Sequence, residues 1–259
     1  MKKLGLFILM ISTVAASAQS IVTDRPSQSN SSTVIPKSSF QVEAGASAIF
    51  TTSGATSASQ LIAPTTLLRY GVSNYFEFRA QTQFESYKAP LDLTRTSGVA
   101  DFQVGIKIRF LDNDEDQTKI AWVSHLSVPT GSRGVSSGEY STINSLAVSH
   151  VLADNISLFY NAGYNVFLDR YGDATYSIGA SLGVTDKLNF FVESYGQYIQ
   201  LKTYQASFDG GLSYLLKDNV QLDFSYGAGL NHKMNFLSLG FSWNTIRGTA
   251  NSQEETVNP

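Results

Sequence analysis

The chain has 259 residues, with 18 basic and 21 acidic side chains and a formal net charge of −3. These charges are interspersed along the sequence, so we expect no basic patch and no nucleic acid among its partners. Cysteine is absent, which excludes disulfides and thiolate metal sites.

Residues 1–18 have the three parts of a secretory signal peptide. Lys2 and Lys3 give a basic start, residues 4–14 form an apolar run, and residues 16–18 are the small residues of a cleavage site. The apolar run is too short to span a bilayer, so an uncleaved anchor is the less favoured interpretation. We therefore expect an exported protein whose mature chain begins directly after this peptide.

Residues 19–38, here named the lead segment, are rich in Ser, Thr, Asn and Pro and show no alternation. This composition predicts an irregular segment on the periplasmic side of a membrane. Asp24 and Arg25 leave two alternatives open. Either they pair with each other or with charges of a barrel and anchor the segment under or inside it, or the segment is a flexible periplasmic leader.

Between residues 39 and 243, apolar and polar residues alternate with a period of two, which indicates half-buried β-strands. The alternating segments number about twelve, and each is near the length that a tilted strand needs to cross an outer membrane. They are expected at residues 40–50, 60–71, 75–86, 98–110, 119–128, 139–152, 156–167, 174–184, 188–199, 204–216, 220–230 and 234–243. Residues 244–259 form a polar tail without alternation.

A short motif recurs between these strands: an apolar residue, three turn residues and another apolar residue. Its aspartates, Asp154, Asp186 and Asp218, are spaced by 32 residues. Short turns of this kind alternate with somewhat longer loops, so both chain ends are expected on the short-turn side. The arrangement predicts an all-β fold, a single transmembrane antiparallel up-and-down β-barrel of about twelve strands.

The charged side chains fall on the face opposite the apolar stripe of the strands. In a soluble barrel that face is the solvated exterior, whereas in a membrane barrel it lines the lumen. The signal peptide, the unbroken apolar face and the aromatic residues near strand ends favour the membrane barrel. The residues expected to line the pore or bind substrate are Glu43, Arg69, Glu77, Arg79, Glu85, Asp101, Lys107, Arg109, His125, Glu193 and Asp223.

The N-terminal part of the chain also resembles a known family. The blocks that carry the resemblance are Thr23, Asp24, Arg25 and Pro26, then residues 34–37 (VIPK), then residues 40–45 (FQVEAG). They resemble the outer-membrane transporter-like family of the phenol meta-degradation pathway, with its pattern TDRP, VPKG and FQxExG. Ser27 stands where the family often has an acid, and Ser38 where it often has Gly. The resemblance implies an outer-membrane barrel of a Gram-negative bacterium that passes small solutes, aromatic compounds among them.

The sequence offers no constellation for catalysis or metal binding. Its three histidines, His125, His150 and His232, lack the spacing of metal ligands. Ser124 adjoins His125, but neighbouring residues face opposite sides of a strand, so local spacing does not make a Ser–His site. We expect His125 to be a residue of the lumen wall, the protein not to be an enzyme, and no cofactor or metal to be bound.

These observations lead to a functional hypothesis: a monomeric channel in the cell outer membrane that passes small solutes passively. Lumen charge and width would select the solutes. Its partners would be the lipid bilayer, the solutes and the barrel-assembly machinery. The alternative left open is a closed, plugged barrel with a structural or adhesive role, because twelve strands lie between small filled barrels and wide porins.

Overall fold

The structure is a computed structural model that describes residues 21–89, 94–113 and 117–245. The predicted signal peptide and nearly all of the predicted polar tail lie outside these residues. The strands are β1 (Phe40–Ser53), β2 (Thr56–Gly71), β3 (Phe76–Lys88), β4 (Thr96–Val99), β5 (Phe102–Asn113), β6 (Thr118–Val128), β7 (Ser141–Ala153), β8 (Ile156–Phe167), β9 (Asp173–Gly183), β10 (Leu188–Ile199), β11 (Thr203–Lys217), β12 (Val220–Gly229) and β13 (Lys233–Asn244).

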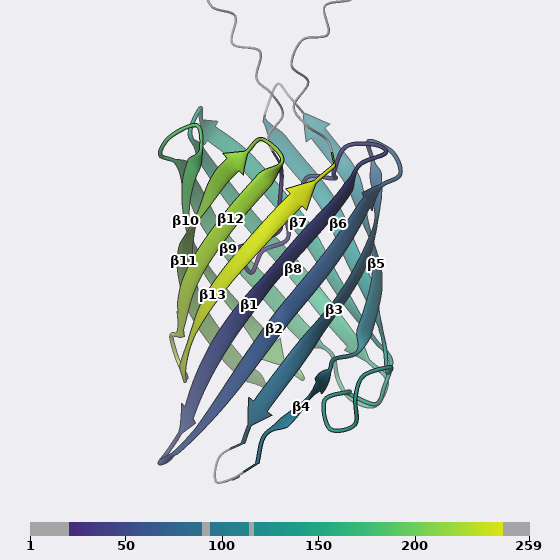
Figure 1. The fold of residues 1–259 in the computed structure, drawn as a ribbon, viewed down its shortest axis with the longest axis vertical. Helices are drawn as coiled ribbons and strands as arrows, with labels where there is room; N and C mark the ends of the chain where they lie inside the picture. Colours follow the sequence, from purple (N-terminus) through teal and green to yellow (C-terminus); the bar gives the residue numbers. More distant parts are fainter. Residues whose placement is uncertain (1–20, 90–93, 114–116, 246–259) are drawn as a thin grey trace, which may run out of the picture.

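The strands form one closed antiparallel barrel, as Figure 1 shows. Each strand from β5 to β13 pairs with its neighbour in sequence, and β1 closes the ring by pairing with both β2 and β13. Closure leaves the ring itself without an open edge, while the short strand β4 pairs with β3 alone. The predicted all-β barrel is therefore confirmed. No helix able to span a membrane occurs in the described parts of the chain.

The wall has twelve strand positions and one extra strand, because β4 and β5 share the same neighbour. Val99 of β4 pairs with Phe84 of β3, and Gln103 of β5 pairs with Gln81 of β3. The sequence predicted one strand over residues 98–110. In the structure this strand is interrupted at residues 100–101. There the Asp101 side chain accepts hydrogen bonds from the β6–β7 loop.

The two ends of the barrel differ. One end, the turn end, carries both described chain termini and the short connections 154–155, 184–187 and 218–219; it is drawn at the top of Figure 1. The other end, the loop end, carries the longer connections. The loop predicted at residues 51–59 is instead a tight hairpin between longer strands. Gly54, with φ of 59°, supplies the left-handed conformation that such a two-residue turn needs.

Alternation sorts the side chains between lipid and lumen, as the sequence predicted. On β3, Phe78 is 54% exposed on the outer face while its neighbour Glu77 is fully buried on the inner face. Near the loop end, the outward rings of Tyr176 and Tyr204 stack with centroids 6.3 Å apart, and Tyr198 packs beside them. Such a cluster is typical of the aromatic girdle at a membrane interface.

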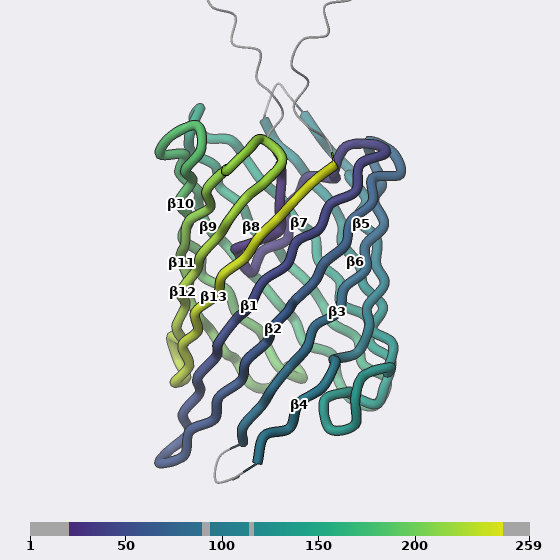
Figure 2. Tube along the Cα trace, in the orientation of Figure 1, coloured from purple at the N-terminus to yellow at the C-terminus, as the bar shows by residue number. Residues whose placement is uncertain are grey.

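The described part of the lead segment, residues 21–38, lies inside the barrel. In the tube view of Figure 2, its purple chain runs within the ring of strands, in the half of the lumen nearest the turn end. Its return limb buries Val34 and Ile35, which are 7% and 1% exposed. Of the two alternatives that the sequence left open, the structure thus has the anchored one, because Asp24 and Arg25 form ion pairs with Lys107 and Asp223 of the wall.

Candidate functional site

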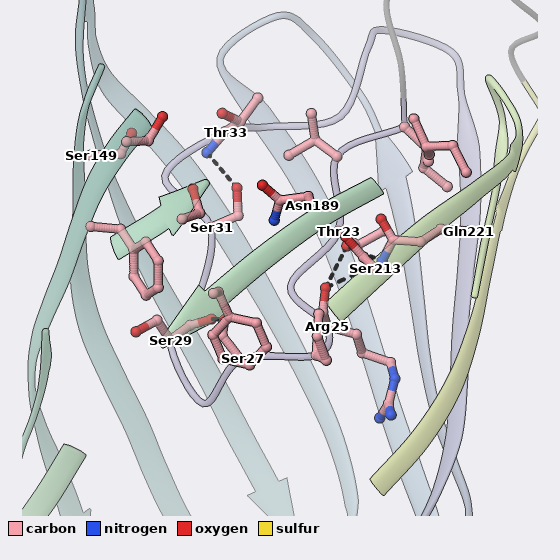
Figure 3. A pocket seen from close by; sticks show the side chains of 18 of the residues that line it. Thr23, Arg25, Ser27, Ser29, Ser31, Thr33, Ser149, Asn189, Ser213 and Gln221 are labelled. Carbon is pink, nitrogen blue, oxygen red and sulfur yellow. Dashed lines mark hydrogen bonds between the residues drawn. The ribbon is translucent and has the colours of Figure 1, made fainter. Parts of the chain in front are cut away.

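The lead segment enters the lumen, turns and returns to the turn end. At its start, the amide of Ile21 donates a hydrogen bond of 2.8 Å to the carbonyl of Asp218 in the β11–β12 turn. Figure 3 shows the chain passing down through Thr23 and Arg25, reversing near Ser27 and Ser29, and rising through Ser31 and Thr33. We call residues 27–31 the tip of the lead segment.

Asp24 is the point at which the entering limb meets one wall of the barrel. Its carboxylate lies 3.0 Å from Nζ of Lys107 and 3.9 Å from Nη1 of Arg69, and it pairs with Nη2 of Arg79. These three cations come from β2, β3 and β5 and are buried, with Arg69 and Lys107 fully so. Unpaired buried cations are costly, so the sequence of the wall requires an anion here.

Two glutamates complete this cluster and bind the lead segment's backbone. Nη1 of Arg69 lies 2.8 Å from Glu43, and its Nε lies 2.8 Å from Glu77. Glu43 also accepts hydrogen bonds from the amides of Asp24 and Arg25, and Glu77 accepts one from the amide of Ile35. With Asp24, the cluster holds three acids and three bases in close contact, so its charges are balanced.

A second ion pair connects the entering limb to β12, which lies beyond the pairing of β1 with β13 that closes the barrel. The guanidinium of Arg25 lies 3.0 Å from the carboxylate of Asp223 on β12, and it donates a further hydrogen bond of 3.0 Å to Ser238 on β13. The Asp223 side chain is fully buried. Asp24 and Arg25 therefore bind different strands of the wall, on the two sides of β1.

The tip of the lead segment is held by uncharged groups and one carboxylate. Glu193 on β10 accepts hydrogen bonds from the amide of Gln28 and from Oγ of Ser29. On β8, the Asn161 side-chain amide binds both backbone groups of Asn30: it accepts from the amide at 2.8 Å and donates to the carbonyl at 3.2 Å. The tip is thus fixed to β8 and β10, across from the ion cluster.

This placement leaves a cavity of about 250 Å³ beside the ion cluster and two larger cavities, which we call chambers. The turn-end chamber has a volume of about 450 Å³; it is bounded by the lead segment and by β7 to β12, and Figure 3 shows it at close range. The loop-end chamber has a volume of about 520 Å³, with Gln28 and Asn30 at its floor and side chains of β7 to β11 in its wall. The lumen is therefore partly open space on both sides of the tip.

The structure places the predicted pore-lining residues in two groups. Those that bind the lead segment directly or through a neighbour are Glu43, Arg69, Glu77, Arg79, Lys107, His125, Glu193 and Asp223. His125 belongs to this group because its Nε2 accepts a hydrogen bond of 3.0 Å from Nε of Arg79.

The other three predicted residues lie elsewhere. Glu85 accepts hydrogen bonds from Gln60 and Gln83 and has no contact with the cluster. Asp101 accepts hydrogen bonds from the β6–β7 loop, and Arg109 pairs with Asp112 near the turn end. These three inward residues therefore lie outside the ion cluster.

Sequence reasoning missed the uncharged residues that hold the tip. Ser29, Asn30, Asn161 and Ser177 gave no signal, because small polar residues are ordinary in both loops and lumen faces. Asp209 was also missed, although its place in the alternation marks it as inward. It is 1% exposed and pairs in register with Glu193.

The described residues give no catalytic or metal-binding arrangement. No group of three or more His, Asp or Glu side chains within them is placed to hold a metal ion. Oγ of Ser124 donates to Asn144, while His125 on the opposite face is engaged by Arg79, so the two do not meet. His150 lies between Thr118 and Tyr160.

Two solved structures with a similar fold are an outer-membrane channel and a porin. The COG4313 outer membrane channel from Pseudomonas putida F1 is similar with a TM-score of 0.72 at 11% identity, over 85% of this chain and 100% of that chain. The KdgM porin in complex with disordered oligogalacturonate is similar with a TM-score of 0.54 at 11% identity, over 78% of this chain and 98% of that chain. At these identities the likeness shows the fold, that of an outer-membrane β-barrel.

The comparison with protein families extends over nearly the whole barrel. A search of curated proteins finds no match. The model of the family described as "Putative MetA-pathway of phenol degradation" matches residues 23–244, from the first residue of the TDRP block to the end of β13. The chain therefore belongs to this family of the phenol-degradation MetA pathway.

Proposed function

We propose that the protein is a monomeric outer-membrane channel that passes small solutes passively. The observation that carries the proposal is the partly open lumen, with chambers of about 450 and 520 Å³ on the two sides of the lead segment's tip. Eight-stranded barrels are filled by their own side chains, whereas a twelve-stranded wall encloses more space. The lead segment occupies part of this space and sets the width of the path.

The family and the fold support this proposal. The two similar solved structures are a channel and a porin. The family description names phenol degradation, so small aromatic compounds are one class of solute to test. Insertion by the barrel-assembly machinery follows from the transmembrane barrel. A catalytic role has no support among the described residues, because the lumen histidine is engaged by Arg79.

The ion cluster changes how selection by charge should work. Five inward charges of the wall and Asp24 of the lead segment neutralise one another in ion pairs within 4 Å. Paired charges present a weak field to a passing solute compared with an unpaired ring. We therefore propose that the cluster's main role is to hold the lead segment, and that the chamber walls act on the solute.

A closed barrel is the second candidate, and one observation favours it. The lead segment is tied to opposite walls, by Asp24 to β3 and β5 and by its tip to β8 and β10. A segment held this firmly could block the path completely. In that case the barrel would have a structural or adhesive role.

Single-channel recording in a planar bilayer separates the two candidates. The refolded protein should give discrete conductance steps if the chambers are connected to both solutions. Heat-modifiable migration in gel electrophoresis would first establish that the barrel is folded. A folded barrel that gives no steps over long recordings would overturn the channel proposal in favour of the closed barrel.

A further inference from the structure

The wall of the loop-end chamber has a row of amide side chains near its mouth. On the inward faces of three neighbouring strands, Gln197 of β10 pairs in register with Gln205 of β11 and Thr175 of β9. The two glutamine side chains are 3.5 Å apart at their closest polar atoms, so their mutual hydrogen bond is long. Each amide offers donors and acceptors together, and this row therefore retains capacity for a partner.

A buried amide oxygen next to this row lacks a partner. Oδ1 of Asn165, on β8, is inaccessible and accepts no hydrogen bond from any described residue. Asn165 lines the same chamber. A buried acceptor without a donor is unfavourable, and a rotation of the Asn165 side chain toward the chamber would let this oxygen accept from a bound hydroxyl group.

A tyrosine ring flanked by hydroxyl groups lies one step deeper. Tyr195 of β10 pairs in register with Ser177 of β9 and Ser207 of β11, and all three line the chamber. The ring gives an apolar surface for the C–H face of a solute, while the hydroxyl groups on both sides can donate or accept.

The chamber is free of formal charge. None of its lining residues is Asp, Glu, Lys or Arg, and the single imidazole is that of His232 in the β12–β13 loop. The acids of the next deeper row are covered: Glu193 binds Gln28 and Ser29 of the tip, and Asp209, which pairs in register with Glu193, is 1% exposed. An ion entering the chamber would lose hydration without meeting a counter-charge, which is costly.

We propose that the loop-end chamber is a binding site for small, uncharged solutes with several hydroxyl groups, of which a monosaccharide is the simplest probe. Its volume of about 520 Å³ lies within the range of small-molecule sites, about 300–1,000 Å³. Amides that bind hydroxyl groups discriminate against solutes without hydroxyl groups, because such a solute would leave the amides without hydrogen-bond partners. As a statement about transport, the inference rests on the proposed channel function.

Binding is measured first, because it does not depend on transport. Saturation-transfer-difference NMR of the folded, detergent-solubilised protein is recorded with D-glucose, gluconate and protonated glucosamine, which share a carbon skeleton and differ in charge. We expect a saturable signal for glucose and signals at least severalfold weaker for the two ions. Equal signals for all three, or no signal for glucose, would overturn the inference.

Two variants locate the site. The double variant Gln197→Leu/Gln205→Leu should reduce the glucose signal severalfold, since Leu keeps the bulk of each side chain and removes its amide. Gln103→Leu is the matched control, because Gln103 lies on β5 outside the chamber, and it should keep the wild-type signal. A double variant that folds and binds glucose as well as the control would place any glucose binding elsewhere and overturn the inference.

Proteoliposome swelling with the same three solutes then distinguishes the two proposals. Faster swelling with glucose than with the ions supports both. Binding of glucose without swelling in any solute supports the site and contradicts the channel function. Swelling that is equally fast in all three, without preferential binding, supports the channel and contradicts the site.

Discussion

Oδ1 of Asp24 lies 3.0 Å from Nζ of Lys107, although 83 positions separate the two residues in the sequence. Lys107 is fully buried on the inward face of β5, and Asp24 belongs to the lead segment. A buried ammonium group requires an anionic partner, and this wall receives one from a segment outside the barrel strands. The contact explains why a Ser- and Asn-rich segment without any alternation has a fixed place in the lumen.

Asp24→Asn should release the lead segment from the lumen. The change removes the anion shared by Arg79 and Lys107, and breaking a buried ion pair from one side costs about 3–5 kcal/mol. We expect a larger single-channel conductance and faster amide hydrogen exchange in residues 21–38. Both are measured on the refolded protein.

The matched control for this change is Asp112→Asn. Asp112 pairs with Arg109 and Lys119 near the turn end and does not contact the lead segment, so conductance should stay at the wild-type value. If Asp24→Asn also leaves conductance and exchange unchanged, the tip contacts to Glu193 and Asn161 hold the segment without the ion cluster.

Arg25 and Asp223 should show strong energetic coupling. Replacing Arg25 with Met leaves the fully buried Asp223 carboxylate without its cation, and Asp223→Asn leaves the guanidinium without its anion. The double variant removes both charges, so it should be more stable than the two single effects predict. In a double-mutant cycle measured by urea unfolding in lipid vesicles, we expect a coupling of about 0.5–3 kcal/mol. Additive effects would show that the pair does not stabilise the barrel.

Val104→Arg should impair membrane insertion. Val104 is 42% exposed on the outer face of β5, and an Arg facing lipid costs about 2–4 kcal/mol near the bilayer midplane. The adjacent change Gln103→Arg faces the lumen and should be tolerated. Folding into vesicles is followed by heat-modifiable migration, and equal yields for both variants would contradict the assignment of faces.

Asp101 should hold the β6–β7 loop in a pH-dependent way. It lies between β4 and β5, and it accepts hydrogen bonds from Gly131, Ser136 and Ser137. Burial raises the pKa of Asp101, but these hydrogen bonds outweigh burial and hold the pKa below its usual value. Because the folded-state pKa is the lower one, the stabilisation is complete above the ordinary Asp pKa of about 3.9 and is lost as the pH falls through the lowered value.

The measurement for this loop is amide hydrogen exchange of residues 131–137, corrected for intrinsic pH dependence. Protection should persist from pH 7 to about pH 4 and decline in stronger acid. Asp101→Asn should lose much of this protection already at pH 7, whereas Glu85→Gln, which affects an acid outside the loop, should not. Protection in Asp101→Asn equal to the wild type would rule out Asp101 as the anchor.

The sequence by itself determined that the chain forms a barrel and which side chains of its strands face the lumen or the lipid. A period of two is a local property of the chain, so it assigns Phe78 to the outer face and Glu77 to the inner face without knowledge of any strand partner. The recurring turns around Asp154 and Asp186 are also local features of the chain, so they predicted the number of strands and the asymmetry of the two barrel ends. Only local deviations were missed, such as the break at Asp101 and the tight hairpin at Gly54.

Only the tertiary structure decided which inward residues form the site. Alternation predicts whether a side chain faces the lumen or the lipid. It does not predict the position of that side chain along the barrel axis or its neighbours on other strands. Glu85 and Arg109 therefore share the inward face of the cluster residues and yet lie away from it. Closure of the ring through β1 and β13 brings Asp223 within reach of Arg25, across 198 positions of sequence. The lead segment has no periodicity, so its place in the lumen depends on charges that meet only once the barrel has closed.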